Sequence, residues 1–115
     1  MDIQTYQQWI SDFYRKRGWY ELNPFIRVNF LSEETGEVAQ AVRALEIGRD
    51  RPDEPVKNQQ ALRQQLTEEL GDVLDNIFIL ADKYDIRLED ILTAHQEKLI
   101  HRFSSEHAND VADNT

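Results

Sequence analysis

Hydrophobic residues recur at intervals of three and four along most of the chain, which is the spacing of one face of an α-helix. This pattern predicts four helices, at about residues 2–18, 23–48, 58–84 and 88–103. Asp2 can cap the first helix, and Gly18 suits its end. Asn23 followed by Pro24 is typical of a helix start, and Gly48 is typical of a helix end.

Nothing in the sequence indicates a sheet, because Val, Ile and Thr never alternate with polar residues over a sufficient length. The stretch 49–55 contains two Pro residues and alternating charges, so we predict a loop there. Four helices with short connections predict an all-α fold, an antiparallel four-helix bundle. We assign residues 1–103 to this single helical domain and predict that residues 104–115 form a disordered, acidic and polar tail.

One pattern of acids and apolar residues occurs twice. The stretch EETGEVAQAVRAL recurs 35 residues later as EELGDVLDNIFIL. The repeat sets Glu34 and Glu37 on the second predicted helix, and Glu69 and Asp72 on the third. The members of each pair are three residues apart and are therefore neighbours on a helical surface. Four carboxylates from two helices could hold a hard divalent cation.

Acids at helical spacing are often no more than a solvated face, but their position relative to the apolar residues argues otherwise here. At about 100° per residue, Glu34 falls inside the apolar stripe of its helix. On the other helix Asn76 and Asp72 form a polar strip beside the apolar side. Ionised carboxylates next to a core are costly unless they are paired or bound to metal. We therefore predict a shared cation site.

The fourth predicted helix carries cations beside its apolar face. On a helical wheel Lys98, Arg102 and His95 border the stripe of apolar residues. Basic residues near a helix C-terminus can act merely as partners of the helix dipole or as snorkelling side chains. Together with four acids they indicate an anionic ligand held between metal and cations. A nucleotide polyphosphate fits, because Mg²⁺ usually binds through a few carboxylates and substrate phosphates.

Composition excludes several other classes of function. The chain has 115 residues, a formal net charge of -9 and no Cys. The negative charge disfavours a nucleic-acid polymer or an anionic membrane as partner. The absence of Cys excludes disulfides and thiolate metal sites. With no long apolar run and no basic-then-apolar start, the sequence predicts a soluble, cytoplasmic protein.

At these acids and cations the chain resembles the MazG-like, all-alpha nucleoside triphosphate pyrophosphohydrolases. The family signature is E-E-x-x-E followed by E-x-x-D on the next long helix, and here it reads Glu33, Glu34, Glu37 and then Glu69, Asp72. The later segment EKLIHRF is similar to the family's Lys and Arg motif, and the resemblance covers about residues 30–103.

The resemblance implies cleavage between the α and β phosphates of a nucleoside triphosphate, which releases a monophosphate and pyrophosphate. It implies Mg²⁺ as cofactor, with Mn²⁺ as a substitute, and a role in clearing the nucleotide pool. By the same analogy Glu34, Glu37, Glu69 and Asp72 are the metal ligands. Family resemblance and modest size lead us to expect a homodimer or homotetramer.

Further roles follow from charge and position. Glu33 is a candidate to orient or deprotonate the attacking water, or else a solvent-facing acid. Asn76 could hydrogen-bond sugar or phosphate, while Lys98 and Arg102 would neutralise the leaving pyrophosphate. His95 departs from the family, whose members often have Asn there, so it is either an altered substrate contact or an ordinary surface histidine. The spacer between the two acid motifs is also longer than the family pattern.

Other features allow two interpretations each. Gly36 and Gly71 are equivalent in the repeat, so each is either a point of close approach for another helix or a tolerated surface Gly. The aromatic residues that could stack on a base are Trp9, Trp19, Tyr20 and Phe25, although such residues are usually in a core or an interface. Arg27 could contact phosphate or pair with an acid.

The main alternative function is a non-catalytic helical bundle that oligomerises and uses its acids for structural metal or partner binding. A carboxylate-bridged di-iron bundle is a third interpretation, but it needs Glu-x-x-His motifs on two helices, which this sequence lacks.

Overall fold

Four α-helices make up the computed structural model, which describes residues 1–48, 53 and 58–104. They are α1 (Ile3–Lys16), α2 (Pro24–Ile47), α3 (Gln59–Lys83) and α4 (Leu88–Arg102). The described residues contain no strand. The predicted all-α fold with four helices is therefore confirmed.

Side-chain caps determine where the first three helices begin. The side-chain oxygens of Asp2, Asn23 and Asn58 accept hydrogen bonds from the backbone N–H three residues ahead, at 2.7, 3.0 and 2.7 Å. Such caps satisfy amides that have no partner within the helix. Gly48 ends α2 with a φ of 89°, a conformation that favours glycine. The predicted cap at Asp2, helix start at Asn23 and helix end at Gly48 are those observed, and the cap at Asn58 lies at the predicted start of the third helix.

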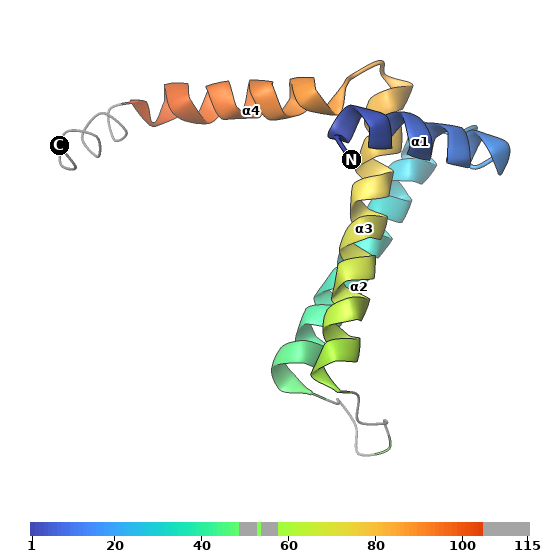
Figure 1. The fold of residues 1–115 in the computed structure, drawn as a ribbon, viewed down its shortest axis with the longest axis vertical. Helices are drawn as coiled ribbons and strands as arrows, with labels where there is room; N and C mark the ends of the chain where they lie inside the picture. The colour runs from blue at the N-terminus through green and yellow to red at the C-terminus, as the bar shows by residue number, and fades with distance from the viewer. Residues whose placement is uncertain (49–52, 54–57, 105–115) are drawn as a thin grey trace.

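α2 and α3 form a long antiparallel hairpin, and α1 packs against α3 (Figure 1). The apolar side chains buried in this assembly are few. They are Ile10 of α1, Ala41 of α2, Leu62, Ile79 and Ala81 of α3, and Leu88 at the start of α4. The hairpin is thus the framework on which both halves of the acid repeat are held.

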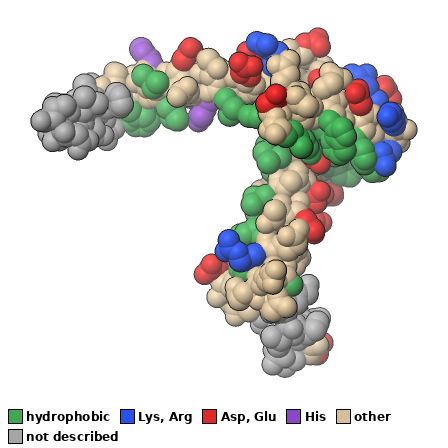
Figure 2. All heavy atoms as spheres, in the orientation of Figure 1, with side chains coloured by type: hydrophobic (Ala, Val, Ile, Leu, Met, Phe, Trp, Pro, Cys, Tyr) green, Lys and Arg blue, Asp and Glu red, His purple; other side chains and the backbone are tan. Residues whose placement is uncertain are grey.

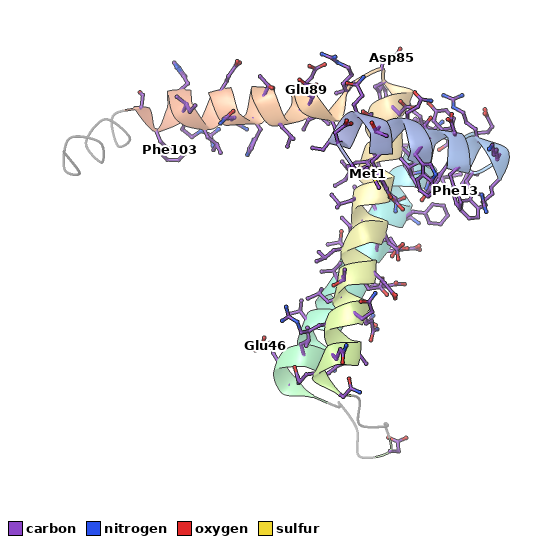
Figure 3. The ribbon with its side chains drawn as sticks, viewed as in Figure 1. Met1, Phe13, Glu46, Asp85, Glu89 and Phe103 are labelled. Atoms are coloured by element: carbon purple, nitrogen blue, oxygen red, sulfur yellow. The ribbon has the colours of Figure 1, made fainter. Side chains whose placement is uncertain are left out.

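α4 extends away from the hairpin instead of lying beside it (Figure 1). Only its base is fixed to the rest of the chain, through Leu88, which is buried, and through contacts with α1. In Figure 3, Glu46 lies near the far end of the hairpin and Phe103 at the far end of α4. The side-by-side packing expected of an antiparallel four-helix bundle is therefore seen within one chain for α2 and α3, whereas α1 crosses the end of the hairpin and α4 extends away from it (Figure 1).

Two sequence predictions lie largely outside the described residues. The predicted loop at 49–55 is described only at Asp53, which is in a turn. The predicted tail, 104–115, is described only at its first residue. None of the described helices is long and apolar enough to cross a membrane. Gly36 and Gly71 face open space, because a Cβ added at either would meet no atom of the described chain within 4 Å.

Candidate functional site

The hairpin brings three of the four predicted ligands together. Glu34 and Glu37 of α2 and Glu69 of α3 each place a carboxylate oxygen within 4.8 Å of the others. We call these three residues the acid group. They meet because α2 and α3 run antiparallel, which sets the two copies of the repeated motif side by side. Asp72 is exposed one turn further along α3 and lies outside this group.

Two oxygens of the acid group lack partners. Oε2 of Glu34 and Oε2 of Glu69 are buried and accept no hydrogen bond from any of the described residues. A buried polar atom without a partner is costly, and such atoms in a folded protein usually have a ligand or an ion to satisfy them. Oxygen ligands at this spacing are those that Mg²⁺ and similar hard cations prefer. The residues present therefore fit a divalent cation.

Glu34, Glu69 and Asp72 have raised pKa values, in part because of the negative charges around them. The pKa of Glu34 is raised, first by burial and then by the negative charges of Glu37 and Asp72. Hydrogen bonding with Glu37, followed by burial and the charges of its neighbours, raises the pKa of Glu69 to about 7. Asp72 also has a raised pKa, from burial first and then from the charges of Glu37 and Glu68. A bound cation would reverse these effects, because it favours the ionised carboxylates.

Arg27 is buried beneath the hairpin surface and binds uncharged groups. It is 4 % exposed. Its Nη1 donates to Oδ1 of Asn76 at 3.0 Å, and its Nη2 donates to the backbone oxygen of Trp19 at 2.8 Å. The guanidinium lies 5.1 Å from the centre of the Tyr14 ring and 5.5 Å from that of Phe30. Within the described residues Arg27 contacts no carboxylate, so the predicted ion pair is not formed.

Asn76 is buried, and both the oxygen and the nitrogen of its side-chain amide form hydrogen bonds within the protein. Its oxygen accepts from Arg27, and its Nδ2 donates to the backbone oxygen of Asp72 at 2.8 Å. Asn76 therefore supports the segment of α3 that carries Asp72. The hydrogen bond to sugar or phosphate predicted from the sequence stays a prediction.

α1 packs against α3 and contributes two tyrosines that the sequence analysis did not select as site residues. Tyr6 donates a 2.7 Å hydrogen bond to Asp75, whose pKa is raised by burial even though this hydrogen bond lowers it. The pKa of Tyr14 is raised by burial and then by the charge of Asp75, with smaller effects of Asp72 and Glu34. Asp75 follows Asp72 by three residues, so helical spacing was a signal that could have identified it.

The predicted cations are not brought to the acid group within one chain. Lys98, Arg102 and His95 are exposed on α4, which extends away from the hairpin (Figure 1). Glu33 is exposed on α2, where its Oε1 lies 3.5 Å from Nδ2 of Asn29. The structure thus assembles the predicted metal ligands more fully than the predicted substrate contacts.

The aromatic residues considered for base stacking lie on and just after α1, except for Phe25. The ring of Trp9 stacks on Phe13 with 5.2 Å between centres. Trp19 packs edge-on against Tyr14 at 5.4 Å. Phe25, at the start of α2, is largely exposed. The backbone oxygen of Trp19 also accepts the 2.8 Å hydrogen bond from Arg27.

Comparison with known proteins identifies the family to which this chain belongs. The family described as the MazG nucleotide pyrophosphohydrolase domain matches residues 26–106. The chain is 57% identical over 108 residues to "Uncharacterized protein YvdC" of Bacillus subtilis (strain 168), which covers 94% of this chain and 100% of that protein. No solved structure shows a significant match. Because the family match spans most of the chain, including every member of the acid group, this protein belongs to the MazG nucleotide pyrophosphohydrolase domain family.

Proposed function

We propose that the protein hydrolyses nucleoside triphosphates between the α and β phosphates. One water is consumed, and the products are a nucleoside monophosphate and pyrophosphate. The proposal includes dependence on Mg²⁺, or Mn²⁺ in its place, and a role in clearing the nucleotide pool of the cytoplasm. Membership of the MazG family supports the reaction class.

The observation that carries the proposal is the acid group with its two unpartnered oxygens. Glu34 and Glu69 keep buried oxygens without hydrogen bonds, and Glu37 lies within 4.8 Å of both. A purely structural cluster would be expected to pair such atoms with donors. When bound, Mg²⁺ would supply charge neutralisation and polarisation of the phosphoryl group.

The chain's own residues divide the remaining tasks. The acid group and Asp72 would hold the cation, and through it the negatively charged triphosphate. Glu33, exposed at the edge of this site, is our candidate to orient the attacking water and take its proton. Arg27 and Asn76 hold α2 and α3 in register beneath the acids through their 3.0 Å hydrogen bond. Lys98 and Arg102 would neutralise the charge that develops on the leaving pyrophosphate.

The test is pyrophosphate release from a panel of normal and modified nucleotides with Mg²⁺. We expect release that EDTA abolishes and added Mg²⁺ restores. Glu37→Gln and Asp72→Asn should each abolish turnover while the helical circular dichroism spectrum is kept. Glu68→Gln is the matched control, because Glu68 is exposed on the same helix and lies outside the acid group.

Two results would contradict the proposal. A non-catalytic scaffold would release no pyrophosphate from any nucleotide of the panel. Full activity in both Glu37→Gln and Asp72→Asn would show that the acids do not serve the reaction.

A further inference from the structure

One carboxylate beside the acid group has no task in the proposed reaction. Asp75 follows Asp72 on α3 by three residues, so the two side chains are neighbours on the helix. Asp75 is half-buried and lies outside the acid group. Its hydrogen bond is to α1 and not to α2, so it does not hold the two helices of the hairpin together.

Tyr6 of α1 holds Asp75 in one orientation. The Tyr6 hydroxyl donates to Oδ1 of Asp75 at 2.7 Å, and the Tyr6 ring packs edge-on against Phe78 of α3 with 5.4 Å between ring centres. Among the described residues, no donor binds the other carboxylate oxygen of Asp75, Oδ2. Asp75 therefore keeps an oriented acceptor for one further hydrogen bond.

This acceptor lies where α1 meets the acidic part of the hairpin. Figure 2 shows acidic side chains on the hairpin directly below the hydrophobic side chains of the α1 region. Tyr14 of α1 lies 5.1 Å from the guanidinium of Arg27, which in turn bonds Asn76, the residue after Asp75. The pKa of Tyr14 is raised by burial and next by the charge of Asp75. Asp75 is thus placed between α1 and the acid group.

Charge determines which part of a nucleotide Asp75 can bind. In the proposed reaction a cation on the acid group holds the triphosphate. Asp75 has the same sign of charge as a phosphate, so direct contact between the two is repulsive. An ionised carboxylate only accepts hydrogen bonds, and the hydroxyl and N–H donors of a nucleotide are in its nucleoside part.

Distance favours the sugar over the base. The sugar is joined to the α phosphate through a single oxygen, whereas the base lies on the far side of the sugar. Residues three apart on a helix have Cβ atoms about 5–6 Å from each other, which is the separation expected between Asp75 and Asp72. Asp72 is a predicted ligand of the cation. A donor one short step from the α phosphate is therefore a sugar hydroxyl.

We propose that Asp75, oriented by Tyr6, accepts a hydrogen bond from a hydroxyl of the substrate's sugar and selects for sugars that carry that hydroxyl. This inference rests on the proposed function, because the acid group must hold the triphosphate. Asp75 contacts the substrate but takes no part in breaking the bond between the phosphates. Its loss should therefore change the discrimination between sugars.

The experiment measures the binding of nucleotides that the protein cannot cleave. The α,β-methylene triphosphates of the four common bases, in ribo, 2′-deoxy and 2′,3′-dideoxy forms, are titrated into the full chain with Mg²⁺ by calorimetry. For the base bound most tightly, removal of the contacted hydroxyl should weaken binding roughly 10- to 100-fold, as for a hydrogen bond to a charged group. Weaker binding of the 2′-deoxy form identifies the 2′-hydroxyl, and weaker binding of only the dideoxy form identifies the 3′-hydroxyl.

Asp75→Ala should abolish this difference between the sugar forms. Asp82→Ala is the matched control, because Asp82 also accepts a hydrogen bond from a tyrosine, Tyr20, at 2.9 Å, and lies seven residues further along α3 from the acid group. Both variants lose a contact between α1 or its C-terminal turn and α3, but only Asp75→Ala should change the ratio of affinities. If Asp75→Ala fails to fold by circular dichroism, Tyr6→Phe replaces it, with Tyr20→Phe as control, and should reduce the difference.

Three results would overturn the proposal. The wild-type chain could bind all three sugar forms equally, or bind none of them. The difference could persist in full in Asp75→Ala or in Tyr6→Phe. Asp75→Ala could alter only the selection among bases, which would assign Asp75 to the base.

These failures are distinguishable from failure of the proposed reaction, because binding is measured without cleavage. The predicted ratios in a chain that releases no pyrophosphate would contradict hydrolysis and leave the sugar contact standing. Pyrophosphate release together with an unchanged ratio in Asp75→Ala would do the reverse.

Discussion

The side-chain oxygen of Gln7 in α1 accepts a 3.2 Å hydrogen bond from the backbone N–H of Leu88, the first residue of α4. The Nε2 of Gln7 donates to the backbone oxygen of Ile86, also at 3.2 Å. α4 has no side-chain cap of its own, so Gln7 satisfies one of its free amides from another helix. This contact fixes the base of α4 and with it the direction in which the helix leaves the hairpin.

We expect Gln7→Ala to lower the free energy of unfolding by about 2 kcal/mol, because it leaves a buried amide and a backbone oxygen without partners. Urea unfolding followed by circular dichroism measures the change. Gln8→Ala is the control, since Gln8 is exposed and its side chain donates to Asp12 one turn away on the same helix, at 3.0 Å. Equal stability of the two variants would show that Gln7 does not hold α4 in place.

Asn76→Ala tests the buried hydrogen bond that supports the site. Its loss leaves the guanidinium of Arg27, which is 4 % exposed, without its side-chain partner. We expect a loss of about 2–3 kcal/mol, which is typical of a buried hydrogen bond to a charged group. Asn29→Ala, at an exposed position on α2, should cost far less. A loss of turnover with unchanged urea stability would instead assign Asn76 to substrate binding.

The raised pKa values predict how metal-free stability depends on pH. Glu69 has a pKa of about 7 in the folded chain, above its ordinary value of 4.5, and the pKa of Glu34 is raised too. Between these values the folded state holds protons that the unfolded state releases, so the free energy of unfolding falls as pH rises. We expect this fall in EDTA between about pH 5 and about pH 7.5, measured by urea unfolding.

Mg²⁺ should counteract that fall, because the cation favours the ionised acids in place of the proton. Its stabilising effect should therefore grow as pH rises. Glu69→Gln should flatten the pH dependence in EDTA, whereas Glu46→Gln, at an exposed position outside the acid group, should leave it unchanged. A wild-type stability in EDTA that does not fall over this range, or that falls equally in Glu69→Gln, would contradict the assignment.

The sequence alone predicted the features that depend on local spacing. The cap at Asp2, the helix start at Asn23 and the meeting of Glu34 with Glu69 follow from turn chemistry, helical periodicity and an antiparallel hairpin. Contacts between residues far apart in the chain leave no such signal. The hydrogen bond from Leu88 to Gln7 joins residues 81 positions apart, so the direction of α4 could not be predicted from periodicity.

The same reasoning explains why the partners of Lys98, Arg102 and Arg27 could not be predicted from the sequence. Lys98 and Arg102 border an apolar stripe, as the helical wheel indicated, but a wheel does not say which chain covers that stripe. Arg27 was expected to meet phosphate or an acid, and its partner Asn76 is 49 positions away. In both cases the local pattern identified a residue that needs a partner, but it could not say which residue that partner is.

Lys98 is expected to serve the acid group of a second copy. Its own α4 extends away from its own hairpin (Figure 1). In the homodimer expected from the family resemblance, α4 can instead reach the hairpin of the second chain. A mixture of Glu37→Gln and Lys98→Ala chains should therefore regain activity that neither has alone. In a mixed dimer one site combines intact acids from one chain with an intact Lys98 from the other. Recovery should approach about a quarter of the wild-type rate, since about half of the dimers are mixed.

The matched control is a mixture of Glu37→Gln and Asp72→Asn chains. Both residues lie on the hairpin of one chain, on α2 and α3, so every site in this mixture keeps one defect and no activity should return. Pyrophosphate release after the two variants are unfolded together and refolded measures both cases, and a tag on one variant confirms by co-purification that mixed dimers have formed. Mixed dimers of Glu37→Gln with Lys98→Ala that stay inactive would show that Lys98 acts within its own chain or not at all.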